Sequence, residues 1–289
     1  MTSSKVNAIR SVAIGVVDVA ASATFYREIW GLIPVSESPE AVYLRGTGPD
    51  HHLLALIQHD RPQVLRLDMT APDRAAVDAL HASLSILGSS LINEPATITE
   101  PGGGYGFSFG DHEGRTIRIL TDPICHAAMA DHPDRPSKIT HVVLNSSDPD
   151  MVSLSKLYCD SLGFTVINKS KNQSFLKCNA DHHSLAFVVN ETNALNHIAF
   201  AMTDVDAVVR GAVRMSAHGY PIGWGVGQHS AGEDVYAYFE GPDGGAIEYI
   251  AKVPLDWNGA ASGTPNWDTE RRPNAILAAA QRRIPFHAA

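Results

Sequence analysis

The sequence predicts an α+β fold built from tandem paired βαβββ modules, which form two curled, barrel-like domains of mixed β-sheet. The chain has 289 residues, which is enough for two hydrophobic cores of ordinary size. Hydrophobic residues make up 44% of the chain and charged residues 18%, a balance typical of globular proteins. A strand-then-helix pattern also recurs at the spacing of one small domain, which indicates an internal repeat.

The first repeated segment is an apolar, β-branched run that ends at an aspartate. It occurs at residues 9–18 and again at residues 139–148. Because aspartate is a favourable helix N-cap, we expect a strand followed by a helix that begins at Asp18 and at Asp148. The helices are predicted to stop at Gly31 and Gly163, since glycine favours the conformation that ends a helix.

The second repeated segment is a strand that leads into a helix through Met-Thr and a capping aspartate. Its two copies begin at Leu65 and Ile198. A third repeated segment, at residues 112–120 and 242–250, is a glycine-containing turn that leads into an alternating strand. The resulting order, β-α-β-β-β twice in each half, favours sheets curled around a cavity over a doubly wound parallel sheet.

The repeat also predicts the domain boundaries. We expect an N-terminal non-catalytic domain at residues 1–121, a linker rich in Pro, Asp and His at residues 122–137, a C-terminal metal-binding domain at residues 138–252, and a tail at residues 253–289.

Charge and cysteine content limit the partners and the compartment. The net charge of −9 and the lack of a basic run disfavour nucleic acid and membrane surfaces. The N-terminus has no signal-peptide pattern and no apolar stretch is long enough to cross a bilayer, so the expected location is cytoplasmic. Cys125, Cys159 and Cys178 form no CxxC pair, which disfavours a disulfide framework or a thiolate zinc site.

The repeat separates one half that can hold a metal from one that cannot. In the second half, the matched strands carry His141, His197 and Glu248; the corresponding positions of the first half are predicted to be Ser11, Val64 and Arg118. Valine offers no donor atom and arginine carries a fixed positive charge, so only the second half is expected to bind a metal in this way.

Two imidazoles and one carboxylate form the facial triad typical of non-haem Fe(II), with positions left for substrate and oxygen. A single histidine on a strand is more often structural than a ligand. The metal interpretation therefore depends on all three residues occurring on matched strands of one repeat. The same ligands also accept Mn(II), so ligand type does not decide between the two metals.

Four stretches of the second half carry a family resemblance: THVVLNSSD, CNADHHSLAFVV, LNHIAFAMTDVDAV and YAYFEGPDGGAIEYI. In order and spacing they resemble the successive strands of the type I extradiol dioxygenases of the vicinal oxygen chelate superfamily, and the likeness extends from about residue 8 to residue 252. The turn at residues 223–234 and the tail after Pro254 depart from the common family pattern, so substrate identity is the expectation most exposed to error.

The resemblance implies His141, His197 and Glu248 as metal ligands. It further implies His183, rather than its neighbour His182, as an active-site histidine, together with His229 and Tyr238. The implied reaction is ring cleavage of a catechol-type vicinal diol with O2 to a semialdehyde or a related ring-opened acid. His183 would act as a general acid on the oxygen side, while His229 and Tyr238 would hold a diol oxygen by hydrogen bonds.

The resemblance leaves other readings open. Another enzyme of the superfamily, such as a glyoxalase-type isomerase or an epimerase, would use a different metal without consuming O2. A metal-free module that sequesters a drug would need no ligands at all. The first half is expected to be structural and to contribute to a homo-oligomer. The sequence does not decide whether the diol is monocyclic, bicyclic or heterocyclic, nor whether cleavage is proximal or distal.

Overall fold

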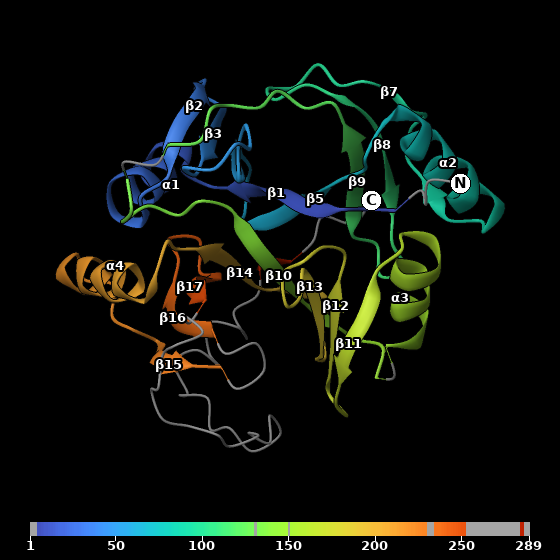
Figure 1. Cartoon of the computed structure of the whole chain (residues 1–289). Helices are drawn as coiled ribbons and strands as arrows, with labels where there is room; N and C mark the ends of the chain where they lie inside the picture. Colours follow the sequence, from blue (N-terminus) through green and yellow to red (C-terminus); the bar gives the residue numbers. More distant parts are fainter. Residues whose placement is uncertain (1–4, 130–131, 150, 230–233, 253–283, 286–289) are drawn as a thin grey trace.

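The computed structural model describes residues 5–129, 132–149, 151–229, 234–252 and 284–285. Within these ranges the chain forms two nine-stranded mixed sheets, one from each half of the sequence. Figure 1 shows the sheets stacked with helices at both sides. None of the helices described is long and apolar enough to cross a membrane.

The first half forms one sheet with the strand order β2-β3-β4-β1-β5-β9-β8-β6, and β7 pairs with β8 outside this order. Its elements are β1 (Ala8–Val16), α1 (Val19–Thr24), the π-helical η1 (Phe25–Trp30), β2 (Ile33–Glu37), β3 (Ala41–Arg45), β4 (Leu54–Gln58), β5 (Gln63–Thr70), α2 (Arg74–Ile86), β6 (Ser90–Leu91), β7 (Ala96–Thr97), β8 (Tyr105–Gly110) and β9 (Thr116–Thr121).

The second half repeats this plan with the order β11-β12-β13-β10-β14-β17-β16-β15. Its elements are β10 (Ile139–Ser146), α3 (Val152–Lys156), the π-helical η2 (Leu157–Ser161), β11 (Thr165–Lys169), β12 (Gln173–Lys177), β13 (Leu185–Val189), β14 (Ala194–Ala201), α4 (Val205–Ala217), β15 (Trp224–Gln228), β16 (Asp234–Glu240) and β17 (Ala246–Lys252). A short strand, β18 (Ile284–Pro285), pairs with β14. The rest of the expected tail lies outside the described residues, as do residues 230–233 of the turn that departs from the family pattern.

The predicted fold class is confirmed, because each half contains two βαβββ modules whose strands combine into one mixed sheet. In both sheets the first strand pairs in parallel with one neighbour and antiparallel with the other, as β10 does with β13 and β14. The sheets end at unpaired edge strands among the described elements, so they are open and curled rather than closed barrels.

The aspartate caps were predicted correctly at three of the four helices for which the sequence suggested one. The Asp18, Asp73 and Asp204 side chains accept hydrogen bonds from the amides of Ala21, Ala76 and Ala207, respectively. The prediction for Asp148 was wrong, because α3 begins later, after Met151. The amide of Asp148 instead donates to the Glu113 carboxylate of the other sheet at 3.3 Å.

The two halves pack together in part through pairs of helices, one from each half. Figure 1 shows α1 beside α4 at one side of the molecule and α2 beside α3 at the other, although each pair combines one helix from each half. Trp30, at the end of η1, is fully buried and stacks on Tyr249 of β17 with ring centroids 3.7 Å apart. This aromatic core fixes β17, the strand that carries Glu248.

Candidate metal centre

The three predicted ligands come from adjacent strands and point to one face of the sheet. Strands β10, β14 and β17 are neighbours. His141 on β10 and Glu248 on β17 both lie opposite Ala199 of β14, and His197 lies two residues earlier on that strand. Because residues two apart on a strand share a face, the register brings the three side chains together.

Their potential ligand atoms form a nearly equilateral triangle. Glu248 Oε2 lies 3.2 Å from His141 Nε2 and 3.3 Å from His197 Nε2, and the two imidazole nitrogens are 3.3 Å apart. Bonds of about 2.1 Å at right angles hold two ligand atoms about 3.0 Å apart, so this spacing fits three adjacent ligands of one divalent cation. Within the described part of the chain, this is the one cluster of His, Cys, Asp and Glu that meets the spacing for a metal ion.

Glu248 is held as a carboxylate at the bottom of the site. Its side chain is fully buried, and burial alone would raise its pKa. Hydrogen bonds with His141, His197 and His229 outweigh this effect and hold the pKa of Glu248 well below its usual range. The site therefore presents a negative oxygen and two imidazole nitrogens, a donor set that suits Fe(II) or Mn(II).

The predicted histidine on the oxygen side, His183, lies next to His141. It precedes β13, and its ring centroid is 4.0 Å from that of His141. Phe175 contacts the ring edge-on at 5.1 Å. Burial, assisted by the neighbouring imidazoles, lowers the pKa of His183 well below its ordinary value. His182 contacts His183 through their Nδ1 atoms at 3.0 Å.

His229 and Tyr238 lie on another side of the triangle, next to Glu248 and His197. His229 Nε2 is 3.2 Å from both the Tyr238 hydroxyl and Glu248 Oε1, and the Tyr238 ring contacts the His197 ring edge-on at 5.0 Å. All six predicted site residues are thus brought into one cluster, in which His183 contacts His141, His229 contacts Glu248 and Tyr238 contacts His197.

An aromatic and aliphatic cavity adjoins this cluster. Besides the site residues, its lining includes Val143, Phe175, Ala186, Val188 and Trp224. Trp224 stacks on Tyr238 with centroids 4.9 Å apart. The sequence prediction did not include Trp224, because the GWGVG segment that holds it differs from the family pattern. An aromatic residue ten to fifteen residues before a predicted active-site tyrosine, on a paired hairpin, was the available signal.

The corresponding place in the first sheet contains an ion-pair network. Asp68 accepts hydrogen bonds from Arg66 at 2.7 Å, from Arg118 at 2.7 Å and from the Ser11 hydroxyl at 2.9 Å. Arg66 and Arg118 also pair with Glu100. Two guanidinium groups therefore occupy the positions of a ligand histidine and the ligand glutamate.

This network corrects one predicted match. Ser11 and Arg118 do correspond to His141 and Glu248, but the counterpart of His197 is Arg66 rather than Val64, because Leu67 and Ile198 pair with equivalent residues of the neighbouring strands. The Met-Thr pair used for the match ends three residues before the capping aspartate in the first half and directly before it in the second half, so it is not equivalent in the two halves. The conclusion drawn from the match is strengthened, since arginine replaces two of the three ligands.

Comparisons with known proteins agree with this geometry. Residues 138–249 match the family model of the Glyoxalase/Bleomycin resistance protein/Dioxygenase superfamily. The chain is 31% identical over 121 residues to metapyrocatechase 2 of Cupriavidus necator; the match covers 41% of this chain and 37% of that relative, so the chain spans well under half of the curated relative's length.

Solved structures match over nearly the whole chain. The Mn(II)-bound glyoxalase from Novosphingobium aromaticivorans is 34% identical, with a TM-score of 0.84 and coverage of 94% of both chains. The homoprotocatechuate 2,3-dioxygenase from Arthrobacter globiformis, at 22% identity, has the same fold, with a TM-score of 0.79 over 93% of this chain and 87% of that chain. The family model and the full-length 34% match together show that the chain belongs to the Glyoxalase/Bleomycin resistance protein/Dioxygenase superfamily, of the vicinal oxygen chelate fold.

Proposed function

We propose that the chain is an extradiol dioxygenase, which cleaves the ring of a catechol-type vicinal diol with O2 and gives a semialdehyde or a related ring-opened acid. The observation that carries the proposal is the triangle of His141, His197 and Glu248 with a histidine on one side and a Tyr–His pair on another. An isomerase needs no such pair of differently placed proton donors. Metapyrocatechase 2 and the homoprotocatechuate enzyme are named for related ring-cleaving chemistry.

The metal would be held by His141, His197 and Glu248, and when bound it would supply the Lewis acidity that lowers the cost of deprotonating the diol and would bring diol and O2 together. The Tyr238 hydroxyl and His229 Nε2, 3.2 Å apart, are close enough to act on one diol oxygen. They would orient the substrate and stabilise its negative oxygen by hydrogen bonds.

His183 would handle protons on the opposite side. Its ring packs on the buried ring of His141 and lines the cavity. An imidazole so placed can hold a proton and deliver it as the ring opens. This assignment separates the residue that moves a proton toward oxygen from the pair that holds the diol.

The cavity lining favours an uncharged substrate. Val143, Val188 and Phe175 face the space beside the ligands, and among its described lining residues none is Lys or Arg. Asp234 also lines it, with a pKa raised to about 6 by burial. A substituent that carries a carboxylate would meet no Lys or Arg among these described lining residues, so we expect alkyl- or aryl-substituted catechols to have a higher kcat/KM than carboxylated ones.

The test is anaerobic reconstitution of the purified chain with Fe(II), and in parallel with Mn(II), followed by mixing with neutral and carboxylated catechols and admission of air. Stoichiometric O2 uptake with a yellow product supports the proposal, and the more active metal identifies the cofactor. A wild-type protein that binds the metal but consumes no O2 across the panel would contradict it.

The second candidate is a glyoxalase-type isomerase, favoured by the 34% identity to the Mn(II)-bound glyoxalase. Such an enzyme would convert a glutathione hemithioacetal without O2 uptake. The same reconstituted protein, assayed anaerobically with that substrate, separates the two candidates. Turnover there together with silence toward catechols would establish the isomerase, whereas a protein that binds no metal would fit a drug-sequestering module.

The location and assembly of the enzyme are part of the same proposal. Cys125, Cys159 and Cys178 are all free thiols, as expected in the reducing cytoplasm. The open sheets leave edge strands for contacts between copies, and we expect a homo-oligomer. Light scattering after size-exclusion chromatography measures the assembly, and a monomeric mass across the working concentration range would contradict it.

A further inference from the structure

A chain of hydrogen bonds leads away from the ligand His197 on the side opposite the metal triangle. The Nδ1 atom of His197 lies 2.8 Å from Asn196 Oδ1, and Asn196 Nδ2 donates to Asn145 Oδ1 at 2.8 Å. All three side chains are buried or nearly so, with exposed fractions of 9%, 6% and 0%. Water therefore has little access to compete for these hydrogen bonds.

The first hydrogen bond determines which nitrogen of His197 carries its proton. An amide oxygen can only accept, so Asn196 selects the tautomer with a proton on Nδ1. The lone pair is then on Nε2, the atom 3.3 Å from both His141 Nε2 and Glu248 Oε2. Because Asn196 Nδ2 donates to Asn145, the Oδ1 atom is the one that faces the imidazole.

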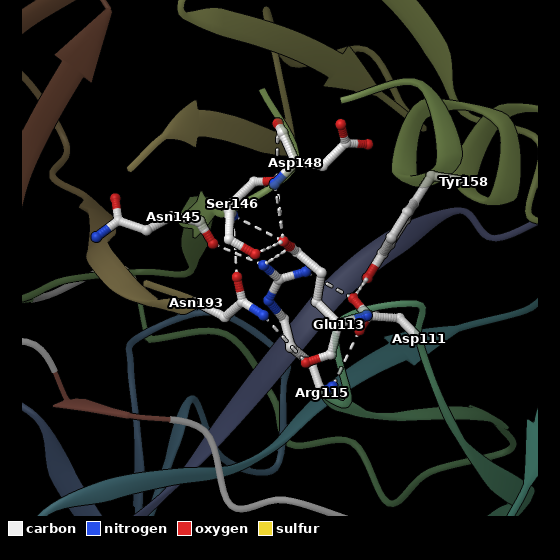
Figure 2. Close-up of polar contacts among 9 residues, drawn as sticks. Asp111, Glu113, Arg115, Asn145, Ser146, Asp148, Tyr158 and Asn193 are labelled. Atoms are coloured by element: carbon white, nitrogen blue, oxygen red, sulfur yellow. Dashed lines mark hydrogen bonds and ion pairs between the residues drawn. The ribbon is translucent and has the colours of Figure 1, made fainter. Parts of the chain in front are cut away.

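The path of hydrogen bonds continues into the other half of the molecule. Arg115, in the turn before β9, donates from Nη2 to the backbone carbonyl of Asn145 at 2.6 Å. Figure 2 shows its guanidinium between Asp111, Glu113 and the end of β10. The Arg115 side chain is fully buried and pairs with Asp111 at 2.8 Å. The ligand-free half thus contacts the strand that supports the metal ligand.

Glu113 reinforces this contact. Its Oε1 accepts hydrogen bonds from the Ser147 amide at 2.7 Å and the Ser146 hydroxyl at 3.1 Å, where β10 ends. Figure 2 shows the carboxylate directed at this segment. Arg115 and Glu113 together hold the final residues of β10, of which Asn145 is one, from the opposite sheet.

The internal repeat provides a comparison for these hydrogen-bonded residues. The strand registers give the position in the other half that corresponds to each member. Gly15 and Leu65 of the first half correspond to Asn145 and Asn196, and Gly245 of the second half corresponds to Arg115. None of the three can continue a side-chain hydrogen-bond chain, and the residue in place of His197 is Arg66. The first sheet therefore folds without these hydrogen bonds, which occur only beside the sheet that carries the metal ligands.

From this we infer that Asn196 is a positioning residue for the metal ligand His197, and that Asn145 and Arg115 hold Asn196 in place from the two halves of the molecule. The inference rests on the metal site of the proposed function. It gives the ligand-free half a role beyond support, because Arg115 contributes to the geometry of the centre.

Mn(II) binding to metal-free protein, followed by electron paramagnetic resonance, tests the inference without any turnover. Asn196→Leu keeps the side-chain volume but removes the acceptor, and loss of such a partner typically weakens metal binding about 10- to 100-fold. Asn196→Asp restores an acceptor for the Nδ1 proton and should bind Mn(II) nearly as tightly as the wild type. Asn193→Ala is the matched control, since Asn193 contacts Ser147 and Glu113 but not Asn196.

A double-mutant cycle tests whether Asn145 acts on His197 through Asn196. Asn145→Leu should weaken Mn(II) binding less than Asn196→Leu, and the double variant should be no weaker than Asn196→Leu alone, because both substitutions interrupt one path. Thermal unfolding of each metal-free variant measures any structural damage separately. If Asn196→Leu does not fold, Asn196→Ser, whose hydroxyl is too short to reach the imidazole, replaces it.

Three results would overturn the inference: wild-type affinity in Asn196→Leu, equal weakening in Asn196→Asp and Asn196→Leu, or additive losses in the double variant. Failure of the wild type itself to bind Mn(II) or Fe(II) would instead refute the metal site. The failure of the inference is thus distinguishable from failure of the proposed function.

Discussion

Glu248 and His183 both lie within the candidate centre, but their surroundings assign them different tasks. Glu248 is buried as a carboxylate between imidazoles, so Glu248→Ala removes a charged ligand and should abolish metal binding. His183 contacts the ring of His141 rather than the ligand triangle, so His183→Ala should keep most of the metal and reduce kcat by about 100-fold or more, the usual share of a general acid. Metal content and single-turnover rates measure the two effects.

The matched control for His183 is its neighbour His182, which lies beside the same strand but was the less favoured candidate. His182→Ala should retain most of the activity. Equal metal loss in the His183 and Glu248 variants, or equal loss of turnover in the two histidine variants, would show that the roles are assigned wrongly.

Tyr238 offers a second residue-scale prediction. Its hydroxyl is 3.2 Å from His229 Nε2 and its ring packs between Trp224 and His197. Tyr238→Phe keeps the ring and removes the hydroxyl, so we expect unchanged metal affinity with kcat/KM reduced about 10- to 100-fold, the worth of one hydrogen bond to a charged oxygen. Steady-state kinetics at saturating O2 tests this, and an unchanged kcat/KM would exclude Tyr238 from orienting the diol.

The metal ligands could be identified from sequence because imidazole and carboxylate groups are rare on matched strands and have a definite chemistry. Asn196 could not, since an amide beside a histidine is common and its role depends on which partner its two ends meet. His183 shows that a histidine at the matching position does not by itself identify a metal centre. The first half has the equivalent His52 beside His51, with a pKa lowered to about 3 by burial, yet it lacks the ligands.

At the scale of the strand, register decides function, and one misplaced dipeptide was enough to mislead the sequence match. The Met-Thr pair lies two residues further from the capping aspartate in the first half, which shifted the predicted counterpart of His197 from Arg66 to Val64. The capping aspartates, Asp73 and Asp204, align correctly, because the helix start is fixed by their hydrogen bonds. Matching by caps rather than by the preceding Met-Thr pair would have found Arg66.

The ion-pair network on β5 gives a prediction at the same scale. Burial alone would raise the pKa of Asp68, but Arg66 and Arg118 outweigh it and hold this pKa well below its usual range. A carboxyl whose pKa is lowered on folding stabilises the protein above its unfolded pKa and loses this contribution as the pH falls. Asp68→Asn should therefore lower the free energy of unfolding at pH 7 by about 3–5 kcal/mol.

Urea unfolding at several pH values checks this prediction. The difference between wild type and Asp68→Asn should shrink as the pH falls below about 4, where the unfolded carboxyl becomes protonated. Asp160→Asn is the control, because Asp160 forms an exposed pair with Lys156 and such pairs contribute little. A difference that stays constant with pH would show that the charge of Asp68 is not what stabilises the network.

At the scale of the whole molecule, the sequence revealed two similar halves but not how they pack against each other. Hydrophobic periodicity shows that a helix has an apolar face, not which sheet receives it. The residues that decide it here are Trp30 and Arg115, each from the ligand-free half and each fully buried against the other half. Their partners are 219 and 30 residues away along the chain, beyond the reach of local patterns.

The last prediction concerns Trp30, whose aromatic contacts join the two halves. We expect that removing this ring from the ligand-free half weakens the metal centre in the other half. The ring packs against Tyr249, Phe200 and Phe239 of the second half, so Trp30→Ala should lower the free energy of unfolding by about 3–5 kcal/mol. Because Tyr249 follows Glu248 on β17, it should also weaken Mn(II) binding. Phe107→Ala, which opens a cavity beside His81 and Phe109 of the first half, should destabilise without that loss. Equal Mn(II) affinity in the two variants would show that the aromatic contact joins the halves without supporting the centre.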